Sequence, residues 1–181
     1  MTQSVFVYGT LMHPVILERV IASKQKVLEP AVLKDYFRFC VSQTDYPAVI
    51  AETGQQVEGI LIKNLNNKEL ERLDLFEGDE YQRISVNILM KSKEIVKGHV
   101  YVWIAVSLNY MKHISQKGKD RLLREPWHLE EFSQQKLHAW IASPIEFAAI
   151  DGLDESSNCG SHFGRALKLD DASSCGSRSA P

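Results

Sequence analysis

The acidic side chain best placed for chemistry is Glu77, which follows the apolar Phe76 and precedes Gly78 where a helix is expected to end. A carboxylate held against an apolar wall has its charged form disfavoured, which raises its pKa and suits it to acid/base work. The alternative is that Glu77 only ends the helix and is solvated beside Asp79 and Glu80. The periodicity of the sequence leaves both interpretations open.

A second candidate is the segment Val5–Met12, in which a compact apolar run passes into Gly9-Thr10. A strand that stops at a glycine and leads to a helix start can expose backbone N–H groups toward a ligand. We predict a strand over Val5–Tyr8 and a helix beginning at Pro14, a residue favoured in a first helical turn. The apolar face of that helix consists of Leu17, Val20 and Ile21.

Other apolar runs predict the elements that must position these two segments. We expect strands over Ala31–Val41 with a polar break at Lys34-Asp35, over Tyr46–Ala51 and Val57–Ile62 with a hairpin turn at Thr53-Gly54, and over Tyr81–Met90 and Val96–Ile104. Asn67 is expected to cap a helix that buries Leu70, Leu73 and Phe76 and turns Glu69, Glu71 and Arg72 to solvent. This order predicts an α+β fold with a mixed, mostly antiparallel sheet or small barrel.

The C-terminal part differs in composition from the rest of the chain. The segment Leu122–Ile141 predicts helical structure that packs outside the sheet or covers its mouth. Its aromatic residues Trp127, Phe132 and Trp140 either cap a pocket or belong to the core. From Asp151 the chain is rich in Ser, Gly and Asp, so we expect one domain over residues 1–150 and a disordered tail over 151–181.

Composition excludes several classes of function. The net charge of −2 without a basic stripe argues against nucleic-acid or anionic-membrane partners. No apolar run reaches the roughly 18–20 residues of a membrane span, and no signal peptide is recognisable, so we expect a cytoplasmic protein. Three widely spaced cysteines and six histidines show no metal-ligand spacing, and phosphate-loop and dinucleotide motifs are missing. We therefore expect neither a metal nor a cofactor. The oligomeric state cannot be read from the sequence.

Two motifs together resemble the γ-glutamylcyclotransferase superfamily, in particular the branch of γ-glutamylamine cyclotransferases and AIG2-like plant proteins. They are Val5-Phe6-Val7-Tyr8-Gly9-Thr10-Leu11 and, after it, Phe76-Glu77-Gly78-x-x-Tyr81-x-Arg83. The Tyr46-Pro47-Ala48 segment also suits the pattern. The resemblance covers roughly residues 4–105, and the C-terminal third carries no matched residue.

The resemblance implies a small β-barrel with flanking helices and a pocket at one mouth. Glu77 falls on the catalytic glutamate of the family, and the loop Tyr8, Gly9, Thr10 and Leu11 falls on the segment that binds the γ-glutamyl group. The implied reaction is attack of the α-amine of the substrate on its own γ-carbonyl, which releases 5-oxoproline and an amine or amino acid. Such an enzyme is a cofactor-independent acyltransferase or C–N lyase.

The roles of other residues stay open at this point. We expect Tyr46 and Tyr81 to line the pocket or to be half-buried strand tyrosines, and Arg83 to pair with a nearby acid. Two other functions compete with the leading one. The same fold could act on another γ-glutamyl or amide-linked biosynthetic intermediate, or the pocket could bind a small molecule without turning it over.

Overall fold

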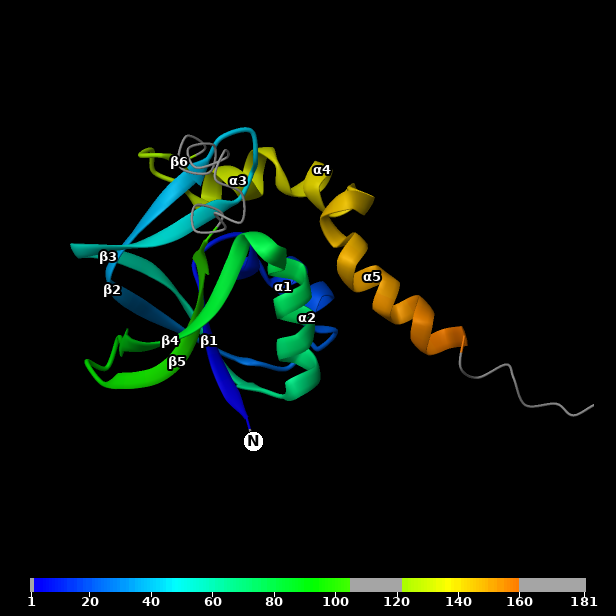
Figure 1. The fold of residues 1–181 in the computed structure, drawn as a ribbon, viewed down its shortest axis with the longest axis horizontal. Helices are drawn as coiled ribbons and strands as arrows, with labels where there is room; N and C mark the ends of the chain where they lie inside the picture. Colours follow the sequence, from blue (N-terminus) through cyan, green and yellow to red (C-terminus); the bar gives the residue numbers. More distant parts are fainter. Residues whose placement is uncertain (1, 105–121, 160–181) are drawn as a thin grey trace, which may run out of the picture.

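Five strands close into a barrel, and the helices pack on its outer face (Figure 1). The computed structural model describes residues 2–104 and 122–159. Its strands are β1 (Gln3–Val7), β2 (Val27–Val41), β3 (Pro47–Leu65), β4 (Tyr81–Met90), β5 (Ile95–Trp103) and β6 (Leu122–Leu123). The order around the barrel is β3-β1-β5-β4-β2, β2 closes the ring by pairing with β3, and β6 extends β2. Only β1 and β5 are parallel among the described pairs, which confirms the predicted mixed, mostly antiparallel α+β barrel.

The end of β1, Val5–Val7, is apolar at each position because both faces of the strand are buried there. Side chains of a strand alternate between its two faces. Phe6 and Tyr8 point into the barrel interior, while Val5 and Val7 pack against the helices outside it. This is why the sequence shows a continuous apolar run here rather than an alternating one.

The expected hairpin at Thr53-Gly54 is wrong, because β3 runs on through this site as one strand. Its two halves both pair antiparallel with β2, through Tyr36–Ala51 and Lys34–Gln56. The extra residues of β3 form a bulge opposite Asp35, whose Oδ1 accepts a hydrogen bond from the Gly54 N–H at 2.9 Å. Gly54 has φ +82°, a value that bulges and turns share, so the sequence signal was ambiguous.

The helices are α1 (Pro14–Ile21), α2 (Asn67–Glu77), α3 (Leu129–Gln135), α4 (Leu137–Ala142) and α5 (Pro144–Cys159). The helix α5 crosses the expected domain boundary at residue 150 and buries Phe147 and Ile150 against the other helices. These two apolar side chains pack the first turns of α5 against the rest of the described structure. The rest of the predicted tail, residues 160–181, lies outside the described residues.

The helix α2 begins one residue earlier than predicted. Asn66, not Asn67, is the N-cap: its side chain accepts from the Glu69 N–H at 3.1 Å, and the Glu69 carboxylate accepts from the Asn66 N–H at 2.8 Å. This capping box turns Glu69 inward, where it is only 5% exposed and pairs with Lys26 at 2.7 Å. The expectation that Glu69 faces solvent is therefore wrong.

Replacing Asn66 by alanine is expected to lower the free energy of unfolding by about 1 kcal/mol, because the first N–H groups of α2 lose their side-chain acceptor. Chemical denaturation of the two proteins measures the difference. Asn67→Ala is the matched control, since Asn67 lies inside the helix and should cost less. A larger loss for Asn67→Ala would contradict the assignment of the cap.

Candidate active site

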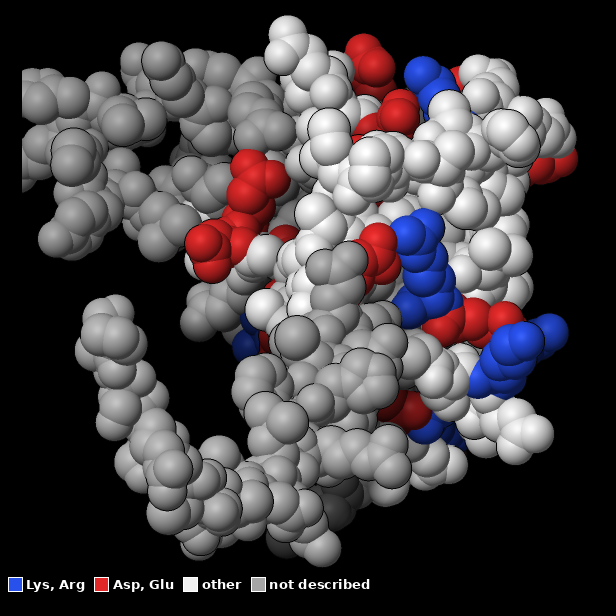
Figure 2. All heavy atoms as spheres, turned by 90° about the vertical axis from the view of Figure 1, so that its right-hand side faces the viewer, with Lys and Arg blue, Asp and Glu red and all other residues white. Residues whose placement is uncertain are grey.

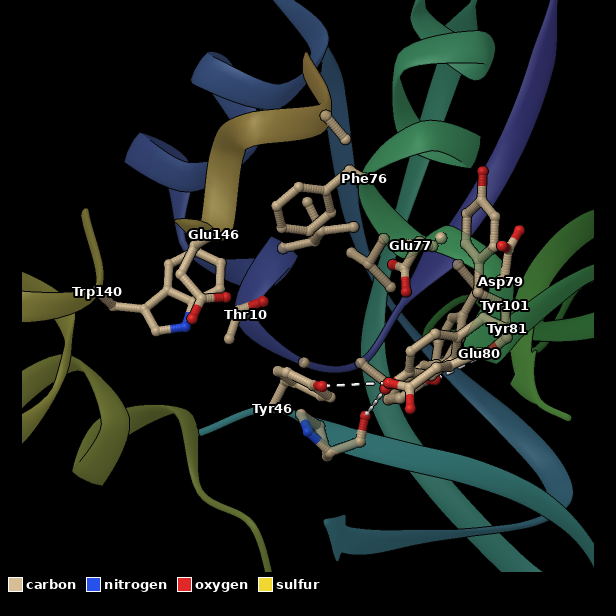
Figure 3. Close-up of a pocket in the computed structure, with 18 of the residues that line it drawn as sticks. Thr10, Tyr46, Phe76, Glu77, Asp79, Glu80, Tyr81, Tyr101, Trp140 and Glu146 are labelled. Atoms are coloured by element: carbon tan, nitrogen blue, oxygen red, sulfur yellow. Dashed lines mark hydrogen bonds between the residues drawn. The ribbon is translucent and has the colours of Figure 1, made fainter. Parts of the chain in front are cut away.

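A cavity of about 280 Å³ opens at one mouth of the barrel, beneath the helices α2 and α5 (Figure 3). It is lined by residues from the end of β1, the start of β3, the end of α2, the strands β4 and β5, and the C-terminal helices: Phe6, Val7, Tyr8, Gly9, Thr10, Leu11, Tyr46, Pro47, Phe76, Glu77, Gly78, Asp79, Glu80, Tyr81, Tyr101, Trp140, Ile145, Glu146 and Ala149. Every residue that the sequence proposed for the site lies on this wall. In Figure 3, Glu77 and Thr10 lie on opposite sides of the cavity, with Tyr46 below them.

The loop after β1 carries its backbone to the cavity through a short 3₁₀ turn, Thr10–Met12. The Met12 N–H donates to the Gly9 carbonyl at 2.9 Å, and the His13 N–H donates to the Thr10 carbonyl at 3.0 Å. The N–H groups of Gly9, Thr10 and Leu11 come before Met12, the first donor of the turn. No carbonyl group within the turn therefore accepts a hydrogen bond from them. The loop thus brings backbone donors to the cavity wall.

Gly9 fits where a larger residue would not. A Cβ atom built on Gly9 would lie 2.9 Å from both Cγ and Cδ of Pro47, the first residue of β3. Contacts this short are not tolerated between carbon atoms, so the loop and β3 approach as closely as they do only because residue 9 lacks a side chain.

Glu77 is delivered to the cavity by the end of α2. Gly78 ends the helix with φ +66°, a conformation that favours glycine, and Phe76 packs against the aromatic rings of Trp140 and Phe147. Burial, and to a lesser degree the nearby carboxylate of Asp74, raises the pKa of Glu77 to about 8. The carboxyl group is therefore poised to exchange a proton near neutral pH, which favours the chemical interpretation of Glu77 over simple solvation.

Replacing Glu77 by glutamine is expected to stabilise the protein increasingly with pH. The folded-state pKa of about 8 lies above the ordinary value of 4.5, so the folded protein binds more protons than the unfolded chain between these values. The stability of the wild-type protein therefore falls as pH rises through this window, and the glutamine variant escapes that loss. The variant should gain about 2–4 kcal/mol relative to wild type between pH 4 and pH 9.

Thermal unfolding of both proteins at several pH values measures this gain. Glu71→Gln is the matched control, because Glu71 lies on the exposed side of the same helix and should show no such trend. A stability difference between wild type and Glu77→Gln that does not grow with pH would show that burial does not raise the pKa of Glu77.

The end of α2 is held to the barrel by an ionic network around Asp74. Arg83 of β4 donates to both carboxylate oxygens of Asp74, from Nε at 2.8 Å and from Nη2 at 2.9 Å. The Tyr101 hydroxyl of β5 donates to Asp74 Oδ1 at 2.7 Å. Arg83 thus pairs with an acid, as expected. Because Asp74 lies one turn before Glu77, the network fixes the turn that carries the catalytic candidate.

Three tyrosine hydroxyls of the wall are engaged with other groups. Tyr8 donates to the Tyr101 carbonyl at 2.8 Å, Tyr81 donates to the Pro47 carbonyl at 3.0 Å, and Tyr46 donates to Glu80 Oε2 at 3.2 Å. Burial is the main cause that raises the pKa of Tyr8 and of Tyr81, and the charge of Glu77 adds to it for both. The phenols of Tyr8 and Tyr81 are therefore neutral near neutral pH.

The C-terminal helices cover part of the cavity, which was one of the two possibilities that the sequence left open. Trp140 and the α5 residues Ile145, Glu146 and Ala149 line the cavity, and the Trp140 ring meets Phe76 at a centroid distance of 6.0 Å. Trp127 and Phe132 belong to the core beside it and do not line the cavity. One aromatic residue therefore covers the pocket while two support it.

The sequence did not assign three of the cavity-lining residues to the site: Tyr101, Trp140 and Glu146. Tyr101 lies near the end of β5, where its only signal is the alternation of a half-buried strand. Tyr8 contacts it from 93 positions away in the chain, and no local pattern encodes such a contact. Asp79 and Glu80 were considered only as neighbours of Glu77, but both line the cavity.

The charged side chains that line the described cavity are all acidic: Glu77, Asp79, Glu80 and Glu146. Figure 2 shows acidic and basic side chains interspersed over the face that it draws, without a continuous basic stripe among the described residues. Within residues 2–104 and 122–159, no three His, Cys, Asp or Glu side chains are arranged to share a metal ion. No helix in the described part of the chain is long and apolar enough to cross a membrane.

Comparison with known proteins agrees with this arrangement. The family model described as gamma-glutamyl cyclotransferase, AIG2-like, matches residues 5–129. AIG2-like protein D of Arabidopsis thaliana is 31% identical over 155 residues, which cover 84% of this chain and 93% of the relative. Protein AIG2 C of the same plant is 33% identical over 104 residues, which cover 57% of this chain and 62% of that protein.

Two solved structures share the fold. The solution structure of an Arabidopsis thaliana protein matches with a TM-score of 0.57 at 23% identity and covers 94% of this chain and 96% of its own. A structure of a gamma-glutamyl cyclotransferase matches with a TM-score of 0.50 at 16% identity and covers 57% of this chain and 67% of its own. The motifs, the barrel and the family match confirm the resemblance seen in the sequence. The chain belongs to the gamma-glutamyl cyclotransferase, AIG2-like family.

Proposed function

We propose that this protein converts a γ-glutamyl amide into 5-oxoproline and a free amine or amino acid, with Glu77 as general acid/base. The observation that carries the proposal is the carboxyl group of Glu77, with a pKa of about 8, on one side of a small cavity and opposite Thr10 of the loop after β1. The family match supports the reaction class.

Proton transfer is the first requirement of the reaction. The α-ammonium group of the substrate cannot attack until it loses a proton to a nearby base. The pKa of Glu77 is raised from 4.5 to about 8, closer to that of an ammonium group, so proton transfer to Glu77 costs less free energy than transfer to an ordinary carboxylate.

Ring closure then needs no other reactant. The α-nitrogen forms a bond to the γ-carbon, and the carbonyl oxygen takes the negative charge of the tetrahedral intermediate. The bond from the γ-carbon to the leaving nitrogen breaks while protonated Glu77 returns its proton to that nitrogen. The second proton on the ring nitrogen passes to the released amine, which leaves as an ammonium ion, so the lactam is neutral and Glu77 is again ionised. Because nucleophile and electrophile belong to one molecule, the pocket has only to hold the folded substrate in a reactive conformation.

The loop after β1 is the proposed site of charge stabilisation. Gly9, Thr10 and Leu11 line the cavity, and we propose that their backbone N–H groups donate to the oxyanion, which fixed donors stabilise strongly in a site that excludes water. Tyr46 and Tyr81 form the adjoining wall, where we propose that they contact the γ-glutamyl group. The leaving group then lies toward Trp140 and Glu146 of the C-terminal cover.

A panel of γ-glutamyl dipeptides, γ-glutamylamines and glutathione, assayed for 5-oxoproline, tests the proposal and identifies the leaving group. Release of 5-oxoproline from at least one member is expected. Binding of these compounds without turnover would point instead to a binding module. Turnover of none, with no binding, would contradict the proposed substrate class.

A further inference from the structure

Arg38 lies outside the cavity but holds the loop that lines it. From β2, its Nη1 donates to the carbonyl oxygen of Tyr8 at 2.8 Å. That carbonyl belongs to the peptide group that joins Tyr8 to Gly9. Tyr8 and Gly9 line the cavity, whereas Arg38 does not. The Tyr8 carbonyl therefore points away from the cavity, toward β2.

The direction of this carbonyl fixes the direction of the next N–H group. The described peptide bonds are trans, and in a trans peptide the C=O and N–H groups point in opposite directions. With its carbonyl held on Arg38, the peptide group turns the Gly9 N–H toward the cavity. We propose that Arg38 is a positioning residue that aims the Gly9 N–H at the oxygen of the reacting carbonyl. This inference rests on the proposed function.

The hydrogen bond also strengthens the donor. A cation at the carbonyl oxygen polarises the whole peptide group, so its N–H becomes a better donor to a developing negative charge. Among the described residues Arg38 forms no ion pair with a carboxylate; its partners are the Tyr8 carbonyl and the Trp127 ring, 5.5 Å from its guanidinium carbon. Burial lowers the pKa of Arg38, so the charge is kept at this half-buried place at a cost in free energy.

Other elements pack around Arg38 and Gly9. The Trp127 ring lies against the Arg38 guanidinium, and its indole Nε1 donates to the Asp45 carbonyl at 2.9 Å. Pro47 of β3 lies close to Gly9. The loop is therefore contacted from β2 and from β3, and the C-terminal segment acts on it through Arg38.

Arg38→Met tests the proposal, because methionine keeps most of the apolar stem and removes both charge and donors. We expect kcat for 5-oxoproline release to fall about 10–100-fold, with KM changed less than about 3-fold. Arg38→Lys should restore part of kcat, since an ammonium group can donate to the same carbonyl. Arg124→Met is the matched control: Arg124 also lies over an aromatic ring, Phe37, at 4.4 Å, but pairs with Glu52 away from the cavity.

A second measurement does not depend on turnover. In the wild-type protein, titration with 5-oxoproline should shift the amide resonance of Gly9, and Arg38→Met should lose that shift while the fold is kept. Wild-type kcat in Arg38→Met, or loss of activity with an unchanged Gly9 response, would overturn the positioning role. If the wild-type protein releases no 5-oxoproline, the proposed function fails, and the Gly9 resonance with a γ-glutamyl ligand still decides the role of Arg38: no response overturns it.

Discussion

Glutamine at position 77 is expected to lower kcat for 5-oxoproline release by about 10²–10⁴-fold, the range that a positioned general acid/base contributes. Glutamine has the shape of glutamate but cannot accept a proton from the α-ammonium group or return one to the leaving nitrogen. The fold should persist, because Glu77 is the last residue of α2 and the network around Asp74 anchors the helix without it. Circular dichroism and a 5-oxoproline assay on the same preparation measure both effects.

The matched control is Glu71→Gln on the exposed side of the same helix, which should keep wild-type kcat. Glu77→Gln should also bind substrate, since its pocket keeps the loop and the aromatic cover. Turnover by Glu77→Gln within about 10-fold of wild type would mean that another group moves the proton.

Alanine at position 9 is expected to lower kcat about 10²-fold, because the new methyl group must push the loop away from Pro47. Restoring the ordinary contact distance of 3.4–4 Å from 2.9 Å requires a shift of about 0.5–1 Å between the loop and the Pro47 ring. Displacements of about 1 Å at donors that face reacting atoms cost on the order of 10² in rate. Kinetics of 5-oxoproline release, with thermal unfolding alongside, separate the loss of activity from the loss of stability.

Gly152→Ala is the matched control for this substitution. Nothing lies within 4 Å of a Cβ built on Gly152 of α5, and alanine favours a helix, so activity should not change and stability should rise slightly. If Gly9→Ala keeps wild-type kcat, the backbone of this loop does not bind the reacting group.

Local sequence signals predicted the main parts of the site. The glycine after an apolar run marked the end of β1, and Pro14 marked the start of α1. The spacing of Leu70, Leu73 and Phe76 placed Glu77 at the end of α2. These signals work because backbone conformation and helix periodicity are set by neighbouring residues.

Features that depend on contacts between residues far apart in the chain could not be predicted from the sequence. The bulge opposite Asp35 resembles a hairpin turn until the partner strand is known, because a glycine with positive φ serves both. The helix periodicity predicts that Glu69 is exposed. In the structure it is buried, because it forms the capping box with Asn66 and an ion pair with Lys26. The roles of Tyr101 and Arg38 arise from strands that meet only when the barrel closes.

The position of the C-terminal helices over the cavity could not be predicted for the same reason. Trp140 and Glu146 reach the cavity because α4 and α5 pack against α2 through aromatic contacts such as that of Trp140 with Phe76. Periodicity indicates that such helices have an apolar face, but not which surface that face covers. Leaving-group preference, the least predictable property of the protein, is assigned by our proposal to this part of the chain.

The most direct test of the central claim is the product formed in water enriched in ¹⁸O. Intramolecular attack by the α-amine consumes no water, so the wild-type protein should convert a γ-glutamyl amide into 5-oxoproline that carries no ¹⁸O, and Glu77→Gln should form almost none. Glutamate that carries ¹⁸O would show hydrolysis instead of cyclisation. That product, or unlabelled 5-oxoproline formed equally well by Glu77→Gln, would contradict the account.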